Sequence, residues 1–253
     1  MGKERSVEVL FTPADFEALG KRDLSETVCV VFDVLRATSS MVTALGNGAK
    51  AILPVSEIDD ALEVWREDLN VLLAGERDGL RIEANLTGST RFDLGNSPRE
   101  FTKDKVAGKK IAMTTTNGTR ALRACAHAQT VLVASFLNLE ATVRFLEKQP
   151  PSQLLVICSG TFDQAAYEDV LGAGALCYRL FGNTSKPDYS DSVSMAMNLF
   201  LDVRDLKLAL SQCRNGHRLM SRSDLQDDIS YCAQQNIFDF AAQMGKDGWV
   251  TAL

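Results

Sequence analysis

One stretch of this chain carries a run of groups that bind anions. Thr114-Thr-Thr-Asn-Gly-Thr-Arg120 lies between the apolar segment 110–113 and the helical pattern 121–126. This order of strand, tight turn and helix predicts a βα unit whose turn offers hydroxyls, N–H groups and a guanidinium at the positive end of a helix dipole. Strand ending and helix capping alone explain only one or two of these polar residues, so we favour an anion site. Its candidate residues are Thr115, Thr116, Asn117, Gly118, Thr119 and Arg120.

A second strand end repeats this arrangement. The continuous apolar run Val28–Phe32 is typical of a strand covered on both faces, and Asp33-Val-Leu-Arg-Ala-Thr-Ser-Ser40 follows it. The acid suits catalysis, and the arginine and hydroxyls suit the binding of an oxyanion. We therefore expect Asp33 and Arg36 to be catalytic, and we expect the substrate to be bound by Arg36, Thr38, Ser39 and Ser40.

Further acids follow other expected strands. Glu76 comes directly after 71–75, Asp93 lies in a long loop, and Glu168 and Asp169 begin an apolar helix. Two or three carboxylates with phosphate oxygens and waters make a Mg²⁺ site. The plain alternative is that first-turn acids favour the helix dipole and that an aspartate forms a turn. We expect Glu76 and Asp93 to join the catalytic residues, and the candidate metal ligands are Asp33, Glu76, Glu168 and Asp169.

The segment 80–100 has no periodicity and is rich in Gly, Ser, Thr and Asn. A loop this long in a compact domain is usually a lid or a substrate-contact loop. Its residues Asn96 and Ser97, together with Arg77 just before it, complete the candidate substrate-binding set.

These clusters need a scaffold that brings strand ends together. Apolar runs alternate with helical patterns from 28 to 158, and residues from about 191 to 236 are predicted to be helical. This order predicts a three-layer α/β/α fold with a largely parallel central sheet and a helical C-terminal part, in which ligands lie at the carboxyl ends of the strands. We expect one domain over 1–253, with 150 as the point where two lobes could meet. The last residues, 249–253, could add an edge strand.

The composition limits the class of partner. The chain has 253 residues, a formal net charge of −6 and 45% hydrophobic residues, which is ordinary for a globular protein. The acidic balance argues against nucleic acid and anionic membranes. It is also unfavourable to a small anionic phosphorylated substrate, which would have to be met by local arginines and amide groups. Six cysteines without a C-x-x-C pair, no signal peptide and no membrane-length apolar run predict a cytoplasmic protein. The sequence is also compatible with a homo-oligomer.

Two covalent phosphatase mechanisms do not fit the sequence. An Asp-x-Asp nucleophile requires a second acid two places after Asp33, where Leu35 stands. A Cys-x5-Arg loop starting at Cys158 requires an arginine where Gln164 stands. Metal-assisted attack by water remains.

Polar and glycine-containing blocks follow one another over nearly the whole chain, at 33–40, 75–79, 92–98, 114–122, 135–138, 158–160, 168–170 and 214–219. In this order they resemble the 2-phosphosulfolactate phosphatase (ComB-like) family. The resemblance implies a ComB-like α/β/α fold and Mg²⁺-dependent hydrolysis of 2-phospho-3-sulfolactate to sulfolactate and phosphate, a step toward coenzyme M. It implies that the candidates above belong to the site, without assigning individual roles.

Two segments depart from the family pattern. Residues 84–91 look like an insertion, and 162–167 differ from the glycine-containing loop expected there. Either change could shift substrate preference without harming phosphatase chemistry. The alternatives are therefore a phosphatase for another small phosphorylated hydroxy acid and a non-catalytic anion-binding protein.

Overall fold

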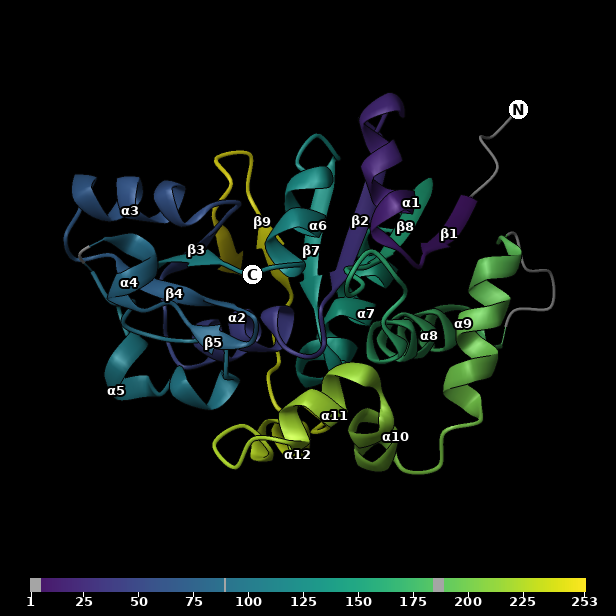
Figure 1. Ribbon diagram of the computed structural model, residues 1–253. Coiled ribbons are helices and arrows are strands. Elements are labelled where there is room, and N and C mark those ends of the chain that lie inside the picture. The colour runs from purple at the N-terminus through teal and green to yellow at the C-terminus, as the bar shows by residue number, and fades with distance from the viewer. Residues whose placement is uncertain (1–5, 89, 184–188) are drawn as a thin grey trace.

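The computed structural model describes residues 6–88, 90–183 and 189–253 (Figure 1). Its strands are β1 Ser6–Leu10, β2 Thr27–Phe32, β3 Ala51–Val55, β4 Leu72–Arg77, β5 Leu80–Arg81, β6 Lys110–Thr114, β7 Thr130–Ala134, β8 Gln153–Cys158, β9 Ala242–Met244 and β10 Val250–Ala252. Its helices are α1 Pro13–Glu17, α2 Ala37–Gly46, α3 Ile58–Glu67, α4 Ala84–Thr87, α5 Lys103–Val106, α6 Gly118–Ala124, α7 Leu139–Lys148, α8 Tyr167–Phe181, α9 Asp191–Leu201, α10 Leu206–Gln212, α11 Arg214–Met220 and α12 Asp227–Cys232. The short 3₁₀ helices are η1 Ala18–Lys21, η2 Pro98–Glu100 and η3 Phe136–Asn138.

The described strands form one sheet in the order β1-β8-β2-β7-β9-β10-β3-β6-β4-β5. The strands β1, β8, β2 and β7 are mutually parallel, and so are β3, β6 and β4. The C-terminal strands β9 and β10 join the two parallel sets through antiparallel pairings. The end of the chain thus adds an interior strand, where an edge strand was expected. Since β8 pairs with both β1 and β2, the chain before and after 150 contributes to the same sheet.

Helices cover both faces of the sheet, which confirms the expected α/β/α architecture with a helical C-terminal part. On β2, alternate residues point to opposite faces: Val30 packs in one core with α7, α8 and α9, whereas Val31 packs in another with α2 and α6. A third, smaller core lies under α3. None of the described helices is long and apolar enough to cross a lipid bilayer.

The two parallel sets run in different directions, which brings their carboxyl ends together. In Figure 1, β2 and β7 run steeply through the picture, whereas β3 and β4 lie across it. The strand β2 therefore ends near the turn that follows β4, and the C-terminal helices α11 and α12 lie against this region. Polar residues from both sets can line one cavity for this reason.

The close contact between α8 and α9 depends on Gly174, and we predict that Gly174→Ala destabilises the protein. A Cβ at Gly174 would lie 2.1 Å from the carbonyl oxygen of Ala196, so the two helices would have to separate. Such overpacking costs about 1–3 kcal/mol. The measurement is urea unfolding, with Gly20→Ala as the control because nothing lies within 4 Å of a Cβ there. Equal stability of the two variants would contradict the prediction.

Candidate active site

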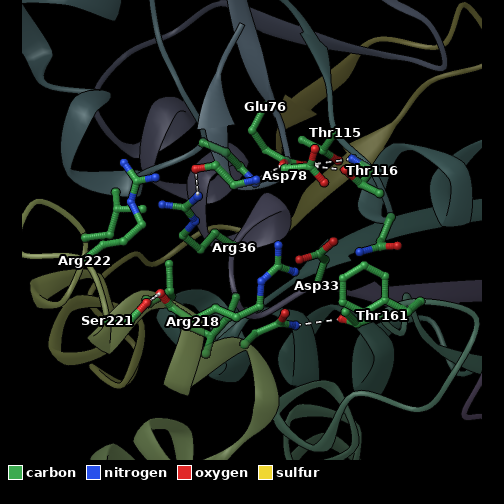
Figure 2. A pocket seen from close by; sticks show the side chains of 18 residues that line it. Asp33, Arg36, Glu76, Asp78, Thr115, Thr116, Thr161, Arg218, Ser221 and Arg222 are labelled. Carbon is green, nitrogen blue, oxygen red and sulfur yellow. Dashed lines mark hydrogen bonds between the residues drawn. The ribbon is translucent and has the colours of Figure 1, made fainter.

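A cavity of about 230 Å³ lies where β2, β4 and β6 end, and α11 and the following turn close it (Figure 2). Its polar walls come from six separate parts of the chain, so no local motif contains the whole site. The polar residues that line it are Asp33, Arg36, Glu76, Asp78, Asn96, Thr115, Thr116, Asn117, Thr161, Asn215, Arg218, Ser221 and Arg222.

Asp33 lies at the meeting point of two helix N-termini. Its Oδ1 accepts the N–H of Ala37, the first residue of α2, at 3.0 Å. Its Oδ2 faces Gly118 at the start of α6 so closely that a Cβ there would lie 2.7 Å away. Burial raises the pKa of Asp33 from its ordinary value of 3.8 to about 6, and the nearby carboxylates Glu168 and Glu76 contribute to the increase. This carboxyl group therefore titrates close to neutral pH.

Glu76 joins the end of β4 to the turn after β6. Its Oε1 accepts both the N–H and the hydroxyl of Thr116 at 2.9 Å, and its Oε2 accepts the N–H of Gly79 at 2.7 Å. These three hydrogen bonds fix the buried side chain on the cavity wall and hold the Thr115–Asn117 turn beside it.

Glu168 and Asp169 are buried behind the cavity and do not line it. Asp169 accepts the N–H of Val34 at 2.8 Å and that of Gly160 at 3.1 Å, so it ties the ends of β2 and β8 together. Burial first, and then the charge of Asp33, raise the pKa of Asp169 well above its ordinary value. Glu168 accepts a hydrogen bond from Asn215 of α11 at 2.5 Å. Both acids thus position backbone and side chains around the cavity.

Arg36 reaches the cavity and is held by an acid that sequence reasoning missed. Its guanidinium pairs with Asp228 of α12 at 2.9 Å, and both side chains are almost completely buried. Asp228 also accepts the hydroxyl of Ser97 at 2.6 Å and a longer contact from Arg99 at 3.4 Å. One buried carboxylate therefore fixes Arg36 and the loop that precedes η2.

Several predicted substrate-binding residues serve as supports of the site. The hydroxyl of Thr38 donates to the carbonyl of Asp33, and that of Ser40 donates to the carbonyl of Asn96. Ser39 similarly bonds to the carbonyl of Val34. Thr119 donates to the carbonyl of Thr115 and thereby fixes the turn before α6. These hydroxyls donate to carbonyl groups of nearby strand ends and loops, so they fix the backbone around the cavity without capping a helix.

Three predicted residues lie away from the cavity. Asp93 accepts the N–H of Leu73 at 2.8 Å. Arg77 donates to the carbonyl of Ser56 and the hydroxyl of Thr114. Arg120 is turned to the surface, where it forms ion pairs with Glu17 and Asp163. The structure therefore does not bring these side chains together with Asp33.

The C-terminal part of the chain supplies residues that sequence reasoning did not name as site residues. Asn215 and Arg218 of α11, and Arg222 in the segment after it, line the cavity. Figure 2 shows Arg222 on the left of the cavity and Thr115 and Thr116 on the right, with Arg218 reaching toward Asp33 between them in this view. The signal that could have found Asn215 and Arg218 is the block 214–219, which belongs to the family pattern although it lies in a helical segment far from the strands.

The donors that line the cavity suit a magnesium ion that would be held in part by water and substrate. Within residues 6–88, 90–183 and 189–253, no three acidic, histidine or cysteine side chains gather closely enough to form a complete metal cage. Mg²⁺ usually keeps several waters and takes only one or two carboxylates, which Asp33 and Glu76 would supply. Asn96 lines the cavity, and its buried Oδ1 has no hydrogen-bond partner among the described residues, so it is an orphaned acceptor at this site.

Comparison with known proteins gives a consistent result. A model of the family described as 2-phosphosulpholactate phosphatase matches residues 15–246. A protein of Caldanaerobacter subterraneus named probable 2-phosphosulfolactate phosphatase is 37% identical over 246 residues, which cover 95% of this chain and 97% of the relative. Proteins with the same name from Thermotoga maritima and Pseudothermotoga lettingae are 37% and 35% identical, over 83% and 96% of this chain and 85% and 98% of the relatives.

Proposed function

Since the chain belongs to the 2-phosphosulpholactate phosphatase family and is a phosphoric monoester hydrolase, we propose that it uses Mg²⁺ to hydrolyse 2-phospho-3-sulfolactate to 3-sulfolactate and phosphate. This is the type of step that leads toward coenzyme M. We further propose that the protein acts in the cytoplasm, because its six cysteines are buried free thiols.

One observation supports this proposal above the others: the cavity has acids on one wall and arginines on the opposite wall. Asp33, Glu76 and Asp78 line the first wall, and Arg218 and Arg222 line the second. A phosphate ester that also carries a sulfonate and a carboxylate requires both, because its phosphoryl group needs a metal site and its other charges need cations.

Different residues of the cavity would have different roles in the reaction. When bound, the ion would polarise a phosphoryl oxygen and lower the pKa of a water molecule. Asp33 and Glu76 would hold the ion, and the unpartnered Oδ1 of Asn96 would accept a hydrogen bond from the attacking water and orient it. Arg36 and the turn at Asn117 would bind the phosphoryl oxygens that do not react.

Phosphate release from a panel of esters tests the proposal. The purified protein is incubated with 2-phosphosulfolactate, 2-phospholactate, phosphoglycerate and an aryl phosphate, each with Mg²⁺ and with EDTA. We expect the highest kcat/KM on phosphosulfolactate, and we expect EDTA to reduce turnover by at least about 100-fold with recovery on adding Mg²⁺.

The other outcomes separate the alternatives. Release only from the unsulfonated esters would retain phosphatase chemistry and change the substrate. Tight binding of phosphosulfolactate without release would favour a non-catalytic anion-binding protein. Full activity in EDTA would contradict the magnesium proposal and point to a covalent nucleophile.

A further inference from the structure

Arg218 differs from the other arginines of the cavity in having no acidic partner among the described residues. Arg36 pairs with Asp228, and Arg222 pairs with Asp224 at 3.0 Å. Among the described residues, the Arg218 guanidinium lies over the face of Phe162, at 5.1 Å from the ring centroid. A cation over an aromatic face keeps the donors at the edge of the guanidinium available. Arg218 therefore has its positive charge and its N–H groups free for a ligand.

The protein holds this arginine at the cavity through contacts around it on α11. Asn215, one turn earlier, donates to the hydroxyl of Thr161 at 2.7 Å and to Glu168. Gly216 lies so close to the preceding helix that a Cβ would come within 1.9 Å of the carbonyl oxygen of Leu210. The helix is thus fixed against the loop after β8, and Figure 2 shows Arg218 extending from it into the cavity.

Arg218 comes from a different part of the fold than the groups that suit the reacting phosphoryl group. Asp33, Glu76 and the turn at Thr116 come from strand ends, whereas Arg218 comes from the C-terminal helices on the other wall. A phosphate at the strand ends would leave any second anionic group of the same substrate facing α11. A guanidinium is well suited to sulfonate or carboxylate oxygens, because it donates two parallel hydrogen bonds.

We propose that Arg218 is a specificity-determining residue, which binds the second, non-reacting oxyanion of the substrate. The inference rests on the proposed function for the identity of that substrate. It also gives a role to Phe162, whose ring holds the guanidinium, in the segment 162–167 that departs from the family pattern.

The test is the kcat/KM of Arg218→Ala on three esters: 2-phosphosulfolactate, 2-phospholactate and an aryl phosphate. The first has a sulfonate and a carboxylate, the second only a carboxylate, and the third neither. We expect the kcat/KM of the variant to fall about 100-fold on phosphosulfolactate and far less on the aryl phosphate. The ratio of kcat/KM on phosphosulfolactate to kcat/KM on the aryl phosphate therefore falls. Arg218→Lys should lose less than Arg218→Ala, because it keeps the charge but not the paired donors.

Arg214→Ala is the matched control. Arg214 is an exposed arginine on the same helix, lies outside the cavity and donates to Gln164. Replacing Arg214 should keep the ratio of kcat/KM on phosphosulfolactate to kcat/KM on the aryl phosphate at the wild-type value. A loss on phospholactate equal to that on phosphosulfolactate supports the proposal with the carboxylate as the bound group, and a loss confined to phosphosulfolactate supports it with the sulfonate.

An equal loss on all three esters would overturn the proposal, because Arg218 would then act on the phosphoryl group or on folding. An unchanged ratio of kcat/KM on phosphosulfolactate to kcat/KM on the aryl phosphate would also overturn the proposal. The wild-type protein tests the proposed function separately: if it hydrolyses phospholactate but not phosphosulfolactate, that function fails, while the ratio of phospholactate to aryl phosphate still tests Arg218.

Discussion

Replacing Asp33 by asparagine is expected to lower kcat by about 1,000-fold or more while the protein remains folded. The carboxyl group lies in the cavity at the start of α2 and α6, with Ala37 as a hydrogen-bond donor and Gly118 in close contact. Asparagine keeps the size of the side chain and an oxygen that can accept the N–H of Ala37. It removes the negative charge that we assign to the magnesium site.

The same substitution should change how stability depends on pH. Because the pKa of Asp33 is raised to about 6 in the folded protein, against an ordinary value of 3.8, the folded state binds the proton more tightly than the unfolded state. The ionised group therefore lowers stability above pH 6, and this cost disappears as the pH falls through about 6 toward 4. A difference of this size corresponds to about 3 kcal/mol. In metal-free protein, Asp33→Asn should thus be more stable than the wild type at pH 8 and equally stable at pH 4.

Steady-state kinetics and urea unfolding in EDTA at the two pH values measure both effects. Asp93→Asn is the control, since Asp93 was also expected to be catalytic but lies outside the cavity, where it accepts the N–H of Leu73. It should keep turnover within about threefold of the wild type. A wild-type level of turnover in Asp33→Asn would contradict the assignment of Asp33 to the site.

Replacing Asp228 by alanine is expected to cost about 3–5 kcal/mol of stability and most of the activity. The carboxylate is fully buried and pairs with Arg36, which is itself 4% exposed. Without it, Arg36 becomes an unpaired buried charge and Ser97 loses the acceptor of its hydroxyl. Arg36 would then turn or draw water into the cavity, and the binding of the phosphoryl group would weaken.

Asp227→Ala is the control for this substitution. Asp227 is the neighbouring residue on α12, but its side chain is 68% exposed and lies 3.7 Å from Arg99, so the change should cost less than about 1 kcal/mol. Thermal unfolding and kcat/KM on phosphosulfolactate measure both variants. If the two substitutions had the same small effect, the Arg36–Asp228 pair would not hold the site together.

The sequence determined the features that depend on neighbouring residues. Apolar runs and helical periodicity predicted the α/β/α architecture, and polar residues at the ends of β2, β4 and β6 line one side of the cavity. Such predictions succeed because strand endings and helix starts are set by local backbone requirements. Asp33, Glu76 and Thr116 could be found in this way. The resemblance of ordered blocks supplied the family, which the local pattern alone does not provide.

Residue type did not determine which of these side chains face the cavity. Arg77 and Arg120 follow strand ends as Arg36 does, yet each bonds elsewhere, because the direction of a side chain depends on its place around the helix or strand and on its neighbours. Likewise, the hydroxyls of Thr38 and Ser39 are used by their own helix start. A candidate for ligand binding and a helix cap have the same sequence signature.

Only the tertiary structure determined which residues form the wall of the cavity opposite the strand ends. Arg218, Arg222 and Asp228 lie more than 180 residues along the chain from Asp33, in or between helices whose apolar pattern indicates packing and nothing about a site. They reach the cavity because the chain that follows them inserts β9 and β10 between the two parallel sets of strands. That insertion depends on pairings between distant segments, such as Val131 with Met244 and Ile52 with Val250, which no local periodicity encodes.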